Sequence, residues 1–169
     1  MHFINQRATT NMNDEKSTEK FTLSDPIQFL ALGFGSGLSP KAPGTMGTLA
    51  AIPLFAGLSF LTPLYYLVVV VLITVLGIYI CQKAADAAGV HDHGAIVWDE
   101  IAGYLITMFM IPLTWKTIAT GFILFRLFDI FKPWPISFID KKIHGGFGIM
   151  LDDVLAGVFS LIIMHLMFS

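Results

Sequence analysis

The feature that most constrains this chain is an unbroken apolar run at residues 64–81, LYYLVVVVLITVLGIYIC, which holds no charged side chain. It approaches the roughly 20 residues that a helix needs to cross the hydrocarbon core of a bilayer. Other apolar segments, each nearer fifteen residues long, lie at 48–61, 101–113, 117–131 and 154–168. Buried helices of a soluble bundle have similar lengths. The shorter segments alone therefore fit a soluble helical bundle as well as a membrane protein.

The composition favours the membrane. Apolar residues make up 55% of the 169-residue chain and charged residues only 13%, and the mean hydropathy is +0.73. A soluble domain of this length needs more charge to cover its surface. We therefore expect an all-α, polytopic membrane helical bundle with about four to five transmembrane helices. The net charge of −2 gives no general attraction to nucleic acid.

The charged residues indicate how such a bundle would be oriented. If the N-terminus is cytoplasmic and every apolar segment crosses, Lys116 is the only one of ten Lys and Arg residues on the outer side. This bias is typical of membrane proteins. All twelve acids also fall on the inner side. Polar chemistry is thus expected at the cytoplasmic face.

The chain divides into two parts by composition. Residues 1–25 are polar and lack the apolar core of a signal peptide, so we expect a disordered cytoplasmic leader. Residues 26–169 contain the apolar segments and form the predicted membrane-embedded domain.

The motif HDHGAIVWDEIAG brings Asp99 and Glu100 to the mouth of the third apolar segment. Acids at a helix start can simply interact with the helix dipole. At the edge of an apolar segment, however, an unpaired charge is expensive, which favours a ligand or catalytic role. His91, Asp92 and His93 fit an exposed loop equally well.

The motif FRLFDIFKPWP spaces Arg126, Asp129 and Lys132 by three residues, which places them on one helical face. The three charges could neutralise one another. Alternatively, Asp129 binds a metal ion, and Arg126 and Lys132 bind phosphate, to which guanidinium groups are well suited. Two prolines then end the helix.

The motif HGGFGIMLDDVLAG contains Asp152 and Asp153, which we expect to open the last helix behind a glycine-rich turn. Adjacent helical residues point about 100° apart, so the pair cannot easily chelate one ion alone. Partners from other helices are needed.

The acids share one predicted membrane depth, where they would repel one another unless a cation neutralised them. Oxygen ligands alone favour a hard cation such as Mg²⁺, which is usually held by a few carboxylates and substrate phosphate. Histidine-based zinc patterns such as HExxH are missing from the sequence. These observations indicate a Mg²⁺-dependent phosphate site.

The stretch GFGSGLSPKAPGTMGTL, residues 33–49, matches neither the P-loop nor the dinucleotide-binding glycine pattern. It presents Lys41, Ser39, Thr45 and Thr48 just before a predicted helix, whose N-terminus could bind an anion. A flexible lead-in without a ligand is the alternative.

Taken together, GSGLSPKAPGTMGTLAAIP, HDHGAIVWDEIAG, FRLFDIFKPWPI and GGFGIMLDDVLAG resemble the motifs of the phosphatidylglycerophosphatase A family, in the same order, from about residue 32 onward. The resemblance implies a bacterial, Mg²⁺-dependent enzyme of the inner membrane. Its expected reaction removes the terminal phosphate of phosphatidylglycerophosphate and leaves phosphatidylglycerol. The expected partner is therefore a membrane phospholipid.

Roles for the residues are our interpretation. The expected catalytic residues are Asp99, Glu100, Asp129 and Asp153. The expected metal ligands are Glu100, Asp129, Asp152 and Asp153. The expected phosphate-binding residues are Lys41, Thr45, Arg126 and Lys132. Since the D-x-D-x-[TV] pattern of aspartyl-phosphate enzymes is missing, direct attack by water is favoured.

Two other classes of protein, an ion carrier and a non-catalytic scaffold, fit the sequence less well. An ion carrier should place charges near the membrane midplane, whereas this chain keeps its charges at segment ends. A non-catalytic scaffold would not need so many acids and bases together. Trp98 and Trp134 are expected mainly to anchor the protein at the membrane boundary.

Overall fold

The computed structural model describes residues 21–89 and 93–168. Residues 1–20 of the predicted leader, together with His91 and Asp92, lie outside them. Within the described residues the regular structure is helical and contains no strand. The expected all-α architecture is confirmed.

Each predicted apolar segment overlaps with a helix, although the bounds differ. The helices are α2 (Pro26–Ala31), the 3₁₀ turn η1 (Ser36–Leu38), α3 (Pro43–Leu58), α4 (Pro63–Ala88), α5 (Trp98–Thr107), α6 (Trp115–Phe131), α7 (Ile136–Lys142) and α8 (Gly145–Phe168). Local chemistry sets several ends. Thr114 and Thr117 form a capping box at the start of α6. Lys132 caps the other end of that helix, just before Pro133, which cannot continue a helix.

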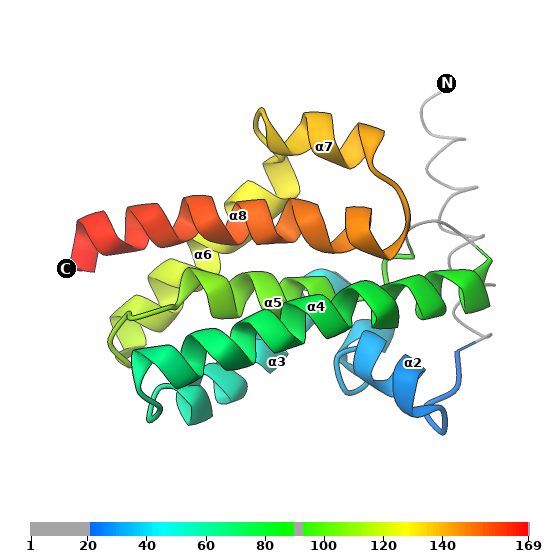
Figure 1. The fold of residues 1–169 in the computed structure, drawn as a ribbon, viewed down its shortest axis with the longest axis horizontal. Coiled ribbons are helices and arrows are strands. Elements are labelled where there is room, and N and C mark those ends of the chain that lie inside the picture. Colours follow the sequence, from blue (N-terminus) through cyan, green and yellow to red (C-terminus); the bar gives the residue numbers. More distant parts are fainter. Residues whose placement is uncertain (1–20, 90–92, 169) are drawn as a thin grey trace.

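Helix α5 lies at the centre of the bundle, in contact with α3, α4, α6 and α8 (Figure 1). Glycines allow α8 to approach it closely. A Cβ at Gly103 would lie 2.8 Å from the Asp153 carbonyl oxygen, and a Cβ at Gly157 would lie 2.6 Å from the Gly103 carbonyl oxygen. Gly103 and Gly157 therefore make room for the contact between α5 and α8.

The start of α8 differs from the prediction. The helix begins at Gly145, so Asp152 and Asp153 lie in its third turn and do not open it. A Cβ at Gly146 would overlap with the carbonyl oxygen of Ile78 on α4. The glycines therefore serve close helix packing here, and the predicted glycine-rich turn is wrong.

The outer surface of the bundle is that of a membrane protein. Helices α4 and α8 are long and apolar enough to cross a bilayer. Helix α4 exposes a continuous set of apolar side chains, Leu64, Leu67, Val68, Val71, Leu72, Val75 and Leu76. Helix α5, at ten residues, is about 15 Å long and mostly buried. The number of spans stays a prediction.

The two tryptophans expected at the membrane boundary differ. Trp98 is only 7% exposed, and its indole N–H donates to the Ile73 carbonyl of α4. Anchoring by Trp98 is therefore wrong, because its ring fills the space beside Gly77. Trp134, in contrast, is 81% exposed.

Candidate active site

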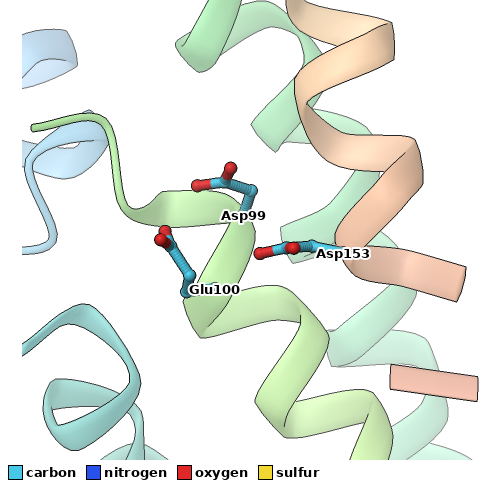
Figure 2. Close-up of side chains that lie close together, drawn as sticks. All are labelled: Asp99, Glu100 and Asp153. Atoms are coloured by element: carbon cyan, nitrogen blue, oxygen red, sulfur yellow. The ribbon is translucent and has the colours of Figure 1, made fainter. Parts of the chain in front are cut away.

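Three carboxylates from two helices form the core of the candidate site. Asp99 and Glu100 lie in the first turn of α5, and Asp153 projects from α8 (Figure 2). One oxygen from each lies within 4.8 Å of the other two. The close packing of α5 on α8 at Gly103 brings residues more than fifty positions apart into this acid cluster.

Some oxygen atoms of the acid cluster are buried without a partner. Glu100 Oε2 and Asp153 Oδ2 have no hydrogen bond among the described residues. Burial, together with the nearby charge of Asp153, raises the pKa of Glu100 to about 8. A buried carboxylate that lacks a partner is costly, so the acid cluster is incomplete without a positive charge.

The Arg126 side chain supplies part of that charge. It donates to Asp129 one turn further along α6, and its Nη1 atom lies 3.6 Å from Glu100 Oε1. Its Nε atom is buried with no hydrogen-bond partner among the described residues. Asp129 is also close enough to act electrostatically on Glu100 and Asp153. The structure thus brings Arg126 and Asp129 to the acid cluster.

The start of α3 covers another side of the site. A Cβ at Gly44 would overlap with Glu100 Oε1 and would lie 2.9 Å from Arg126 Nη1. Thr45 follows and is half-buried, whereas Lys41 is exposed. Thr48 is buried, and its hydroxyl donates to the Gly44 carbonyl. The glycine-rich stretch therefore reaches the acid cluster through Gly44.

Lys132 and Asp152 belong to a neighbouring network. The Lys132 ammonium donates to Asp152 of α8 and to Asp140 of α7, the latter at 2.7 Å. Burial lowers the pKa of Lys132, but these hydrogen bonds outweigh burial and leave the pKa above its usual value. We call these three residues the lysine clamp. Asp152 and Asp153 therefore point to different sides of α8: Asp152 contacts Lys132, and Asp153 lies in the acid cluster.

Sequence reasoning missed Asp140. It lies on the short helix α7, beyond two prolines, and no periodicity links it to Lys132. A single acid followed by Lys141 and Lys142 does not indicate a site residue. His93 is also unlike the exposed loop residue considered above, because it is 2% exposed and its Nδ1 accepts from the Ala95 N–H.

The acid cluster fits a hard divalent cation. Every candidate ligand atom is a carboxylate oxygen, and hard cations prefer oxygen ligands. Two of these oxygens lack hydrogen-bond partners among the described residues. Arg126 beside them is suited to an anion that bridges the cation and the protein.

The chain is similar to known proteins along most of its length. Residues 29–168 match the family described as phosphatidylglycerophosphatase A. A protein of that name from Escherichia coli K12 is 51% identical over 142 residues, 83% of this chain and 83% of the relative. Another of that name from Haemophilus influenzae is 48% identical over 154 residues, 90% of this chain and 94% of the relative.

A further relative carries another name. A protein from Bacteroides thetaiotaomicron, provisionally named a phosphatidylinositol-3-phosphatase, is 41% identical over 143 residues, 79% of this chain and 88% of the relative. No solved structure matches the chain. The match to nearly the whole described chain confirms the resemblance seen in the motifs: the chain belongs to the phosphatidylglycerophosphatase A family.

Proposed function

We propose that this protein hydrolyses the terminal phosphate monoester of phosphatidylglycerophosphate in a Mg²⁺-dependent reaction at the cytoplasmic face of the inner membrane. The names of the Escherichia coli and Haemophilus influenzae relatives support this substrate. The observation that carries the proposal is the acid cluster, which contains two partnerless oxygens and lies beside Arg126.

Asp99, Glu100 and Asp153 would hold the metal ion, with Asp129 adjacent to them. Bound there, Mg²⁺ would polarise the phosphoryl oxygens and offset the charge that develops during transfer. The metal role expected for Asp152 is less well supported, since its Oδ2 atom accepts from Lys132.

The protein's own groups would bind and orient the phosphate. Arg126 reaches the acid cluster and has a free Nε, so it can pair with phosphate oxygens. The first N–H groups of a helix lack partners within it, and α3 begins beside Glu100 and Arg126 at Gly44. Thr45, next to Gly44, would be a further phosphate contact, and the exposed Lys41 would attract the charged substrate from farther away.

The reaction needs one proton acceptor and one proton donor. A carboxylate of the acid cluster takes a proton from the attacking water, whose oxygen forms the new bond to phosphorus. The bond from phosphorus to the glycerol oxygen breaks, and that oxygen takes up the proton that the carboxylate received from the water. Phosphatidylglycerol and inorganic phosphate are the products.

The lipid part of the substrate fits the surface of the bundle. The exposed apolar side chains of α4 would contact acyl chains, while the acid cluster lies at the end where α5 begins (Figure 1). The lysine and arginine distribution supports a cytoplasmic position for that end.

One assay tests both the substrate and the metal. Full-length protein purified in detergent receives phosphatidylglycerophosphate with Mg²⁺ or with EDTA, and free phosphate is measured. We expect release with Mg²⁺ and none with EDTA. Release in both conditions would refute the metal requirement but leave the substrate, whereas no release in either would refute the function.

The Bacteroides relative supports a second substrate for the same site. Phosphatidylinositol 3-phosphate is therefore assayed in parallel under identical conditions. Faster turnover of this lipid would replace phosphatidylglycerophosphate as the preferred substrate while preserving the phosphatase chemistry.

A further inference from the structure

The last residue of α6 and the segment that joins α6 to α8 carry exposed aromatic and basic side chains within a short stretch of sequence. Phe131 is 74% exposed, Trp134 81% and Phe138 50%, and Lys141 and Lys142 are exposed as well. We call these five residues the aromatic–basic patch. They lie outside the acid cluster and the lysine clamp, and the proposed reaction does not use them.

The fold explains why these side chains point outward. Ile136 is fully buried, and α7 packs against α8 along that side. Phe138 and Lys142 are four residues apart and so share a face, and the Lys142 ammonium lies 4.3 Å from the centre of the Phe138 ring. The outer face of α7 is thus held in place as a combined aromatic and cationic surface.

The structure also shows at which end of the bundle the patch lies. Helix α7 lies beside the first half of α8, near the end where α5 begins with its acids (Figure 1). Exposed apolar side chains of α6, Ile123, Leu127 and Ile130, precede the patch. The chain therefore changes from an apolar surface to a charged one across the patch, as it does at a membrane–water boundary.

We propose that the aromatic–basic patch lies in the head-group region of the bilayer and binds anionic phospholipids through Lys141 and Lys142. Aromatic rings partition into this region, and lysines near it attract anionic head groups. A water-facing surface would instead leave Phe131 and Trp134 exposed at a cost in free energy. The proposal does not depend on which phosphate ester the acid cluster hydrolyses.

The test uses Trp134 as a native probe. Full-length protein is reconstituted in phosphatidylcholine vesicles that contain a minor fraction of brominated phosphatidylserine or, at equal fraction, brominated phosphatidylcholine. Bromine on the acyl chain quenches nearby indoles. The emission of Trp134 is obtained as the difference between wild type and Trp134→Phe. Phosphatidylserine is chosen because the proposed reaction neither consumes nor forms it.

We expect both brominated lipids to quench Trp134, with phosphatidylserine enriched by about fivefold for each lysine. Lys141→Gln with Lys142→Gln should abolish this preference but not the quenching. Lys116→Gln is the matched control, since Lys116 also lies over an aromatic ring, that of Trp115 at 5.9 Å, but lies in the first turn of α6, at the opposite end of that helix from the patch.

The possible results separate cleanly. Quenching of Trp134 by aqueous iodide and by neither lipid would overturn the position in the bilayer and would indicate a protein-facing surface. Equal quenching by the two lipids in the wild type would overturn anionic-lipid binding. A loss of preference in Lys116→Gln as large as in the double variant would overturn the assignment to the patch.

Discussion

Asp152 and Asp153 are neighbours on α8 and both are buried, yet they have opposite surroundings. Asp152 Oδ2 accepts from Lys132, which also holds Asp140. Asp153 faces Asp99 and Glu100 (Figure 2). A helical step of about 100° therefore separates an acid that the protein neutralises from one that it leaves among other acids.

The comparison shows how one helix can serve both stability and chemistry. In the lysine clamp, one ammonium at the end of α6 joins a carboxylate of α7 to a carboxylate of α8, so the three helices are linked. In the acid cluster the charge is unbalanced, and partnerless oxygens remain at Glu100 and Asp153. An unbalanced buried cluster costs stability, which is typical of sites that bind a ligand.

The largest expected effect on activity comes from Asp153→Asn. Loss of one carboxylate from the acid cluster removes a proposed metal ligand, and we expect kcat/KM for phosphate release to fall by roughly 10²–10³-fold. Asp152→Asn, measured alongside, should lower kcat/KM by only about tenfold, because it would affect the acid cluster only indirectly, by shifting α8. Similar losses in the two variants would contradict the distinction between clamp and cluster.

A smaller loss is expected when the space beside Glu100 is filled. Gly44→Ala would place a methyl group against Glu100 Oε1 and Arg126, so α3 must shift away from the site. We expect about a tenfold to hundredfold fall in kcat, because small displacements of catalytic groups are costly. Phosphate release under saturating substrate measures it.

Gly57→Ala is the matched control on the same helix. Nothing lies within 4 Å of a Cβ at Gly57, and alanine favours a helix over glycine. Its kcat should equal that of the wild type. If Gly44→Ala also kept full activity, the start of α3 would not form part of the site.

Much of this arrangement could be predicted from the sequence because it depends on local patterns. The apolar segments located the helices, and the positions of Asp99 and Glu100 at a helix start followed from their place before an apolar run. The angle of about 100° between adjacent helical residues also indicated that Asp152 and Asp153 need partners from other helices. Patterns of this kind depend only on residues that are close together in the sequence.

Features that depend on contacts between distant segments could not be predicted. Gly146 packs on Ile78, so the glycines extend α8 although their composition favours a turn. Trp98 is buried, and its indole N–H donates to the Ile73 carbonyl of another helix. Asp140 joins Lys132 across two prolines. In each case the partner is far away in the sequence and tertiary packing outweighs local preference.

The stability of the two aspartate variants should change in opposite directions. In EDTA, Asp153→Asn removes one of three repelling acids, and we expect it to raise the free energy of unfolding by about 1–2 kcal/mol. Asp152→Asn weakens its link to Lys132 and should lower the free energy of unfolding by about 1–2 kcal/mol, allowing for partial exposure of the clamp.

Thermal denaturation of detergent-purified protein, followed by circular dichroism, measures this difference. Added Mg²⁺ should stabilise the wild type and Asp152→Asn more than Asp153→Asn, since binding to the folded state raises stability. A fall in stability for both variants in EDTA would mean that Asp153 is already neutralised within the protein.

The smallest effect is expected from Lys41→Ala, which tests how far the site extends from the acid cluster. Lys41 is exposed, so its charge is screened by water and salt, unlike that of Arg126 within the bundle. We expect KM to rise about threefold to fivefold at low ionic strength, with kcat unchanged and the difference fading as salt is added. Initial rates across a substrate series at two salt concentrations measure both constants. A fall in kcat that persists at high salt would place Lys41 in contact with the reacting phosphate, because a merely steering charge acts before the chemical step.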